Sequence, residues 1–182
     1  ERILAERLAQ QDPLTGLNNR RAFYDRTRSL WGQAIRHGHH TAVMLFDLDL
    51  FKQINDVHGH AHGDDVLKAM AGILKQSVRQ GDILARWGGE EFIVFLPETS
   101  MQEAMALAER LREAIAGLRI PRETGETAVT ASFGIAQLEP RHITLDALIA
   151  SADECLYQSK QQGRNRVTGS LAVHATVTSV FG

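Results

Sequence analysis

The feature that most constrains the fold is a continuous apolar run at residues 42–46, AVMLF, which is followed by Asp47 and Asp49. A short run without polar interruptions is typical of a strand that is buried on both faces, because a half-buried strand alternates apolar and polar residues. Burial on both faces requires helices on both sides of the sheet. The run therefore predicts a central strand, with carboxylates placed where that strand leaves the core.

Two further β-type runs, at residues 83–87 and 92–96, flank the glycine-rich sequence Gly88-Gly89-Glu90-Glu91. This arrangement predicts a hairpin, so part of the sheet is expected to be antiparallel. Apolar residues at helical spacing predict helices that alternate with the strands. The pattern as a whole predicts one α/β domain, with helices at about 20–36, 66–74, 104–118 and 145–156, a strand at 128–137, an edge strand at 165–167, and a loop through Asn55, Asp56 and Gly59.

The chain of 182 residues is 43% hydrophobic and 23% charged, with a net charge of −2. Such a balance gives no general attraction to nucleic acid or to an anionic membrane, so a polyanionic ligand would need a metal ion or a few aimed cations. Cys155 is the single cysteine, which excludes an internal disulfide and fits a reducing compartment. The longest apolar runs fall short of the ~20 residues that span a bilayer.

Both ends of the chain are expected to lie outside the domain. Residues 1–11 resemble the end of a charged amphipathic linker helix from an upstream region, and the chain begins at Glu1 without a methionine, as a fragment of a longer protein would. Residues 170–182 carry no helical stripe and are expected to be a tail or a remnant. The predicted domain therefore spans residues 12–169.

The acids near the central strand and the hairpin are candidates for a metal site. If the hairpin neighbours the strand, Asp47, Glu90 and Glu91 converge, and their mutual repulsion calls for a divalent cation. Gly88 and Gly89 allow the backbone to approach a ligand closely. The alternative is that these acids form only a solvated strand end and a plain turn.

The residues that follow the central strand could bind a nucleotide. Lys52 and nearby backbone N–H groups suit a triphosphate, whereas Asn55 and Asp64 offer an amide and a carboxylate that could read a guanine edge. Taken alone, a single lysine is usually a solvent-facing charge, and Asn or Asp is more often a cap of a helix or turn.

Five blocks in this order resemble the GGDEF family of diguanylate cyclases over about residues 12–167. The resemblance implies a single palm-like domain with a central, mixed, mostly antiparallel five-stranded sheet flanked by helices, as in nucleotidyl cyclases. It also implies a bacterial signalling enzyme that condenses two GTP molecules into cyclic di-GMP. The blocks are DPLTGLNNRRAF, FDLDLFKQINDVHGHAHGDDVL, RWGGEEF, TASFGIA and DECLYQSKQQGRNRV.

The resemblance assigns roles to residues of this sequence. Asp47, the Leu48 carbonyl and Glu90 match the ligands of two metal ions, with Glu91 beside them; Mg²⁺ is implied, and Mn²⁺ can substitute. Glu90 is also the candidate base or base-positioner, and Lys52 matches a residue that steadies phosphate charge. The implied substrate contacts are Phe51, Lys52, Asn55, His60, Asp64, Gly88, Gly89, Lys160 and Arg164, with Leu14, Gly16 and Leu17 in a turn beneath the site.

The implied reaction needs two domains, because each domain holds one GTP. A homodimer is therefore expected for catalysis, together with an upstream sensor or regulatory domain and a cytoplasmic location. Neither nucleic acid nor direct membrane contact is expected. Arg79-Gln80-Gly81-Asp82 matches the family's R-x-x-D inhibitory product site, to which Arg110 of an adjacent domain could contribute; the alternative is a surface ion pair.

Other functions remain open at this stage. A catalytically silent domain that binds cyclic di-GMP or GTP as a receptor is the main alternative, and the presence of Asp47, Lys52 and Glu90 favours catalysis over it. A polymerase-like palm would share the metal chemistry, but the sequence lacks a basic track. The segment His58-Gly59-His60-Ala61-His62 could suggest zinc, although His60 is accounted for by the family pattern.

Overall fold

The computed structural model describes residues 9–170. Residues 1–8 of the predicted linker helix and the predicted tail from residue 171 onward lie outside the described residues. The centre is a five-stranded sheet in the order β2-β3-β1-β6-β7. The pairing of β6 with β7 is parallel, and the other three pairings are antiparallel, which confirms the predicted mixed sheet. The strands are β1 (Thr41–Leu48), β2 (Ile83–Arg86), β3 (Glu91–Pro97), β6 (Ala131–Gln137) and β7 (Val167–Gly169).

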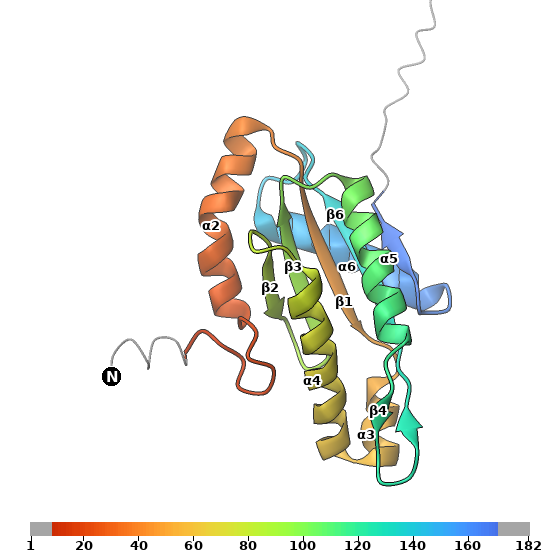
Figure 1. Cartoon of the computed structure of the whole chain (residues 1–182). Coiled ribbons are helices and arrows are strands. Elements are labelled where there is room, and N and C mark those ends of the chain that lie inside the picture. The colour runs from red at the N-terminus through yellow and green to blue at the C-terminus, as the bar shows by residue number, and fades with distance from the viewer. Residues whose placement is uncertain (1–8, 171–182) are drawn as a thin grey trace, which may run out of the picture.

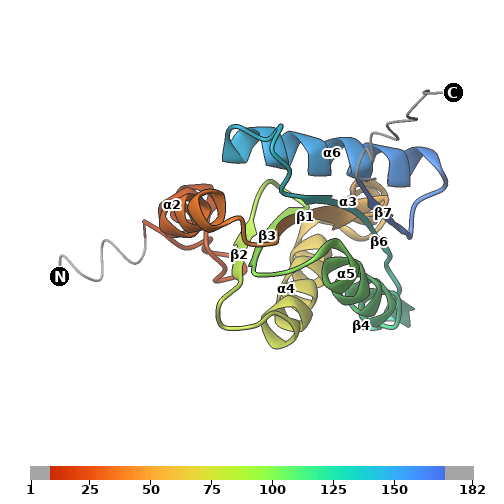
Figure 2. The same cartoon turned by 90° about the horizontal axis from the view of Figure 1, so that it is seen from above.

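Helices cover both faces of this sheet. Figure 1 shows the order of the elements, and the view from above in Figure 2 places α4 and α5 on one face and α6 and α2 on the other. The predicted α/β domain, with helices that flank a central sheet, is thereby confirmed. The helices are α2 (Arg20–His37), α3 (Phe51–His58), α4 (His60–Ser77), α5 (Met101–Ala116) and α6 (Leu145–Gln161).

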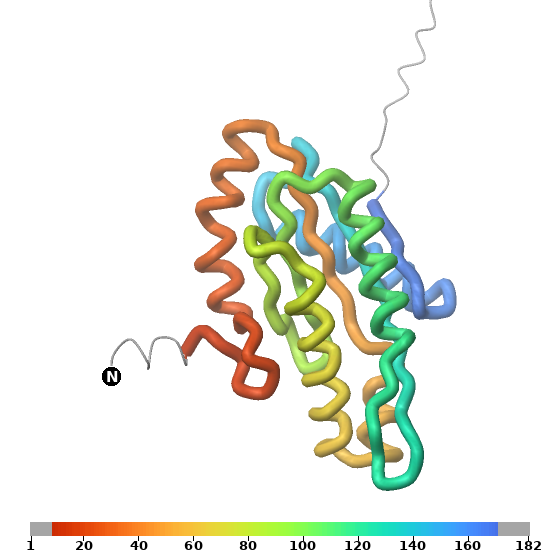
Figure 3. Tube along the Cα trace, in the orientation of Figure 1, coloured from red at the N-terminus to blue at the C-terminus, as the bar shows by residue number. Residues whose placement is uncertain are grey.

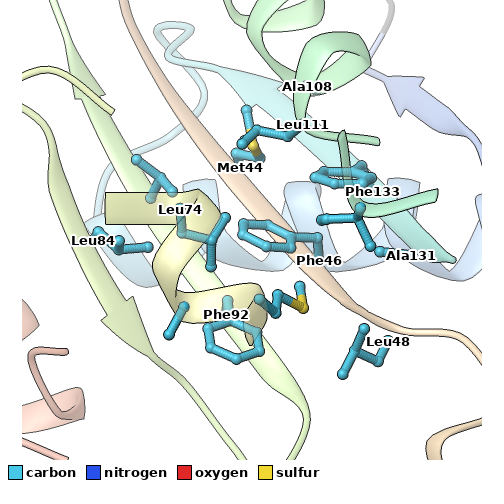
Figure 4. Packing of buried hydrophobic residues seen from close by; sticks show 14 of the residues in the cluster. Met44, Phe46, Leu48, Leu74, Leu84, Phe92, Ala108, Leu111, Ala131 and Phe133 are labelled. Carbon is cyan, nitrogen blue, oxygen red and sulfur yellow. The ribbon is translucent and has the colours of Figure 1, made fainter. Parts of the chain in front are cut away.

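Alternation along β1 divides the core into two clusters. Met44 and Phe46 point toward α4 and α5, where Phe46 stacks on Phe133 with ring centroids 4.7 Å apart (Figure 4). Val43 and Leu45 point to the opposite cluster, which α2 and α6 cover. Because successive side chains of a strand alternate in direction, Asp47 continues the set that faces α6.

Local signals explain where the helices begin. Ser100 and Glu103 form a reciprocal capping box at the start of α5, and the Asn19 side chain accepts a hydrogen bond from Ala22 N at the start of α2. Thr144 caps α6 in the same way. At its other end α2 stops at Gly38, which has the left-handed backbone conformation (φ 63°) that glycine adopts without strain.

The predicted loop through Asn55, Asp56 and Gly59 is wrong, because Phe51–His58 forms the short helix α3, which ends at Gly59. A helix of 8 residues with Phe51 as its buried member carries too little periodicity to be recognised. Strand β6 also begins three residues later than predicted, at Ala131, and β7 begins at Val167.

A small hairpin between α5 and β6 was not predicted from the sequence. Its strands, β4 (Ile120–Pro121) and β5 (Glu126–Thr127), have two residues each and so carry no alternation to detect. The tube in Figure 3 shows this segment extending beside α4 at one end of the domain. His62 of α4 and Thr127 of β5 meet there, with Nε2 and Oγ1 2.8 Å apart.

Within residues 9–170, none of the helices combines the length and the apolar character that crossing a lipid bilayer requires.

Candidate active site

Asp47 lies inside β1, one residue before its end, rather than beyond the strand as predicted. It is 5% exposed and lies in register opposite Glu91 of β3 and Ser132 of β6. Lys160 reaches it from α6, with Nζ 2.5 Å from Asp47 Oδ2. The contact depends on a close approach of α6 to the sheet, which Gly134 permits: a Cβ there would stand 2.8 Å from Leu156 Cα.

The electrostatics of Asp47 are those of an incompletely neutralised site. Burial raises the pKa of Asp47 to about 6, the hydrogen bond and charge of Lys160 oppose that rise, and the charges of Glu91 and Asp49 add to it. Its second oxygen, Oδ1, is buried without a hydrogen-bond partner among the described residues. A buried carboxylate oxygen without a donor is costly, and a cation is the partner that would relieve this cost.

The hairpin between β2 and β3 brings further acids to Asp47. Leu48 N donates to Glu90 O at 3.3 Å, so the Leu48 backbone and Glu90 are neighbours, and Trp87 N donates to Glu91 O at 2.8 Å to close the turn. Across residues 9–170, no three His, Cys, Asp or Glu side chains are already close enough to hold an ion by themselves. Oxygens from the backbone and from a phosphate ligand would therefore have to complete a metal shell.

Arg86 fixes this hairpin to the N-terminal turn. Its guanidinium donates to Gly89 O at 2.6 Å and to both carboxylate oxygens of Asp12, at 3.0 and 3.1 Å. Although burial alone would raise the pKa of Asp12, hydrogen bonds from Thr15 and Arg86 outweigh it and hold that pKa below its usual value. The turn at Asp12–Leu17, closed by Asp12 N donating to Leu17 O, thus supports the hairpin from beneath.

Asp49 has a role that the sequence reasoning missed. Its carboxylate, 8% exposed, accepts from Thr130 Oγ1 at 2.7 Å, from Ser132 Oγ at 2.6 Å and from Asn165 N at 3.0 Å. These donors come from β6, from the residue before it, and from the turn after α6. The signal in the sequence was the spacing Asp47-x-Asp49, but the partners could not be read from it. Asp49 joins the end of β1 to the turn that follows the cationic end of α6.

That turn has an unusual backbone. Gly163, Arg164 and Asn165 have φ values of 114°, 64° and 45°, and the two side-chain-bearing residues are strained in this conformation. Arg164 N donates to Ser159 O at 3.0 Å, and Asn165 N donates to Asp49, so hydrogen bonds on both sides hold the strained residues. The exposed Arg164 is thereby held in the turn that follows α6, the helix that carries the half-buried Lys160.

The start of α3 offers backbone donors beside the acids. Hydrogen bonds within the helix begin at Gln53 N and Ile54 N, both to Leu50 O, so the N–H groups of Phe51 and Lys52 precede them. The Phe51 side chain is buried in the core, so only its backbone could meet a ligand, whereas the Lys52 side chain is exposed. Free N–H groups at a helix start are suited to bind an anion.

The other end of α3 faces the start of α4. Asn55 is half-buried, and its Oδ1 is enclosed without a hydrogen-bond partner in the described part of the chain. Asp64 and His60, on the first turns of α4, are exposed. The structure therefore brings the predicted amide and carboxylate to the same helix–helix junction.

The predicted inhibitory site is a structured turn. Arg79 N donates to Asp82 Oδ2 at 2.8 Å, and its Nη2 donates to Thr99 Oγ1 at 2.6 Å and lies 3.4 Å from Asp82 Oδ1. The side chain of Asp82 is 1% exposed, and that of Arg79 is 63% exposed. Arg110 is exposed on α5. The arginines face solvent, and the aspartate shapes the turn.

The histidines near Gly59 have structural contacts. His62 is buried against Thr127, and His58 packs edge-on against it with ring centroids 5.5 Å apart. Burial lowers the pKa of His58, and the charges of Arg122 and His62 lower it further. The adjacent guanidinium makes this pair a poor place for a cation.

The fold and the site can now be compared with known proteins. Residues 9–166 match the family model described as "Diguanylate cyclase, GGDEF domain". Diguanylate cyclase DgcM of Escherichia coli K12 is 41% identical over 162 residues, which are 89% of this chain and 38% of that protein. Response regulator PleD of Caulobacter vibrioides is 41% identical over 167 residues, 91% of this chain and 37% of PleD. The chain therefore spans about two-fifths of the length of these relatives.

Solved structures agree with these relatives. The coiled coil and GGDEF domain of DgcB from Caulobacter crescentus, in complex with c-di-GMP, has a TM-score of 0.87 at 32% identity and covers 92% of this chain and 89% of its own. The active GGEEF domain of a diguanylate cyclase from Vibrio cholerae has a TM-score of 0.79 at 30% identity, with 85% and 97% covered. The chain belongs to the GGDEF domain family of diguanylate cyclases.

Proposed function

We propose that this chain condenses two molecules of GTP into cyclic di-GMP and two pyrophosphates. The observation that carries the proposal is the buried Asp47, whose Oδ1 is without a partner among the described residues and which lies in register with Glu91 beside the Gly88–Glu91 turn. A structural ion pair with Lys160 alone would leave that oxygen unexplained. Family membership supplies the reaction class, and the donor set fits it.

We further propose that Asp47, the Leu48 carbonyl, Glu90 and Glu91 hold two Mg²⁺ ions. The set consists of oxygens, which Mg²⁺ prefers, and it is incomplete without phosphate oxygens. When bound, the ions neutralise charge on the reacting phosphate and lower the pKa of the attacking hydroxyl. Lys160 pairs with Asp47 when no nucleotide is bound, and it would then have a second role as a contact to a phosphate of the nucleotide.

The substrate is proposed to lie along α3. The N–H groups of Phe51 and Lys52 and the side chains of Lys52, Lys160 and Arg164 would bind the triphosphate. At the other end, Asn55 and Asp64 would read the guanine edge, with Asp64 accepting from the ring N–H and the exocyclic amine. His60 is proposed to line the same pocket, and Gly88 and Gly89 leave room for the sugar and phosphates.

The proposed reaction forms a bond between the 3′-oxygen of one GTP and the α-phosphorus of the other. The bond from that phosphorus to the β-phosphate oxygen breaks, and pyrophosphate leaves. Glu90 accepts or positions the proton of the 3′-hydroxyl. Since one chain supplies one GTP, two chains must face each other about a two-fold axis for both bonds to form.

The proposal is tested by incubating the purified chain with GTP and Mg²⁺ and identifying the products by chromatography and mass spectrometry. Cyclic di-GMP and pyrophosphate in a 1:2 ratio are expected. To separate weak dimerisation from a lack of chemistry, the chain is also fused to a parallel dimeric coiled coil. Binding of GTP or cyclic di-GMP without product, even in the fused dimer, would contradict catalysis and support a receptor.

We also propose that product inhibits the reaction through Arg79 and Asp82, with Arg110 contributed by an adjacent domain. The exposed guanidiniums suit the phosphates and guanine edges of cyclic di-GMP. Turnover should fall non-competitively as product is added, and Arg79→Ala should keep its rate. Arg119→Ala, which removes another exposed arginine, is the control. Inhibition that is unchanged in Arg79→Ala would refute the assignment.

A further inference from the structure

Gly63 is a buried glycine in the first part of α4, at a position where the helix would favour another residue. Its backbone is helical, and its N–H donates to Gly59 O at 3.1 Å. Glycine in a helix is less favourable than alanine by about 1 kcal/mol, so its presence requires a packing reason. The same helix contains Gly72, which is exposed and would accept a Cβ with no heavy atom within 4 Å.

The packing reason at Gly63 is the side chain of Asn55. A Cβ on Gly63 would overlap Asn55 Oδ1, would stand 3.0 Å from Asn55 Cγ and would lie 3.2 Å from Phe51 Cζ. Phe51 is buried in the core and cannot move aside cheaply, so Asn55 would have to move. The amide of Asn55 therefore occupies the space that the absent side chain leaves.

This arrangement fixes which way the Asn55 amide faces. Its Oδ1 is buried against α4 at Gly63 and has no hydrogen-bond partner within residues 9–170. The oxygen thus lies against the backbone of α4, next to the Hα of Gly63 that a Cβ would replace. A Cα–H group makes at best a weak hydrogen bond to an oxygen. Because the two heteroatoms of an amide point to opposite sides of Cγ, the amide nitrogen is left to face away from the contact with Gly63. Asp64, the residue after Gly63, is exposed.

We propose that Gly63 determines the specificity of the pocket for guanine, as a positioning residue that acts through Asn55. The inference rests on the proposed function and deepens it. The gap at Gly63 orients the amide as a donor toward a carbonyl oxygen of the base, beside an acceptor for the adjacent ring N–H. A guanine edge offers that pair, and an adenine edge offers an amine and an unprotonated ring nitrogen instead.

The first test uses calorimetric binding of a GTP analogue with a methylene bridge between its α and β phosphorus atoms, and of the matching ATP analogue, both with Mg²⁺. Gly63→Ala should weaken binding of the GTP analogue about tenfold or more and reduce the preference for it over the ATP analogue, since the Asn55 amide that would donate to the base is displaced. Gly72→Ala should bind both analogues as the wild type does, while its melting temperature rises by about 2–4 °C.

Two further measurements separate positioning from general damage. In the nucleotide-free chain, the side-chain NH₂ resonance of Asn55 should shift in Gly63→Ala and not in Gly72→Ala. Asn55→Ala combined with Gly63→Ala should bind no more weakly than Asn55→Ala alone, because removal of the amide relieves the overlap. Additive losses in the double variant would indicate an effect that bypasses Asn55.

The outcomes are distinct. Wild-type preference for the GTP analogue in Gly63→Ala, with an unshifted Asn55 resonance, would overturn the role of Gly63 and leave the proposed function standing. A wild-type chain that shows no preference for the GTP analogue would overturn the proposed function, and the inference would fail with it. If Gly63→Ala does not fold, the double variant decides the matter, because Asn55→Ala removes the overlap. A double variant that folds and binds as Asn55→Ala does would support the inference, and one that also fails to fold would overturn it.

Discussion

The candidate site has two ends that are held in place by different means. The carboxylate end, made of Asp47, Glu90, Glu91 and Lys160, lies on the strands β1 and β3 and under α6. The nucleobase end, made of Asn55, Gly63 and Asp64, lies at the junction of α3 and α4. The first has one buried carboxylate, Asp47, which a cation already opposes, and its other members are half-buried. The second presents an exposed carboxylate next to a single packing gap.

The difference shows what each task requires. Reaction with a polyphosphate needs charges at fixed positions, so the fold buries Asp47 and Asp49 and offsets the cost with an ion pair and hydrogen bonds. Reading a base needs only the correct donor and acceptor, which two exposed turns of helix can supply. Substitutions at the carboxylate end should therefore affect chemistry or folding, and those at the nucleobase end should affect affinity alone.

The largest effect is expected at the carboxylate end. Glu90→Gln keeps the shape of the side chain and removes its charge, so kcat for cyclic di-GMP synthesis should fall about 10²- to 10⁴-fold. Circular dichroism and the melting temperature should stay as in the wild type, because Glu90 is only half-buried and its backbone makes the contact with Leu48. Glu98→Gln, at an exposed glutamate, is the control; retained synthesis in Glu90→Gln would refute the role of Glu90.

At the nucleobase end, Asp64→Asn should raise KM for GTP about 10- to 100-fold, since the acceptor for guanine is replaced in part by a donor. Stability should not change, because Asp64 is exposed. Its neighbour Asp65 is also exposed and lines a different hollow with His62 and Arg122, so Asp65→Asn should leave KM as it is. Equal effects of the two substitutions would remove the distinction between the two ends.

Asp49 sharpens the comparison, because it supports the carboxylate end without belonging to the proposed ligands. Asp49→Asn can still accept from Ser132 through its remaining oxygen, but its amide nitrogen would replace Oδ2, the oxygen that accepts from both Thr130 Oγ1 and Asn165 N. Urea titration should show a loss of about 1–3 kcal/mol in the free energy of unfolding. KM for GTP should also rise as the turn at Arg164 loosens; a normal KM in the destabilised variant would show that Asp49 serves folding only.

The smallest effect concerns the support beneath the hairpin. Asp12 has a lowered pKa in the folded chain. Its contribution to the free energy of unfolding is therefore fully present above its pKa in the unfolded chain, near 3.8. That contribution is lost as the pH falls through its pKa in the folded chain. Asp12→Asn should therefore lower the free energy of unfolding by about 1 kcal/mol at pH 7 and pH 5. The difference in the free energy of unfolding between Asp12→Asn and the wild type should become smaller toward pH 3. A difference that grows there would contradict the direction of the pKa shift of Asp12.

The elements with local signals could be predicted from the sequence, and those that depend on distant contacts could not. The apolar run before Asp47 and the glycine-rich hairpin are local patterns, so the sheet and its mixed character followed from them. Helix α3 was missed because it buries chiefly Phe51. The residues of the site were named through a family resemblance, since neither spacing nor composition could show that Lys160 meets Asp47.

The supporting contacts show the same limit. Asp49 and Asn165 are 116 positions apart, and the gap at Gly63 depends on how α3 turns into α4. Patterns in a sequence report which residues are apolar or polar at short range, but they do not report which polar group receives which donor. The scaffold of the site could thus be predicted, and its supports could not.

The parallel pairing of β7 with β6 has a consequence for how the protein is made. Parallel neighbours need a crossover, which α6 provides, so Lys160 and the turn at Arg164 lie on the connection from β6 to β7, late in the described part of the chain. During synthesis Asp47 and Asp49 therefore leave the ribosome long before Lys160 and Asn165, their partners in the folded chain. Because these contacts join distant parts of the sequence, we expect this end of the site to assemble late in folding.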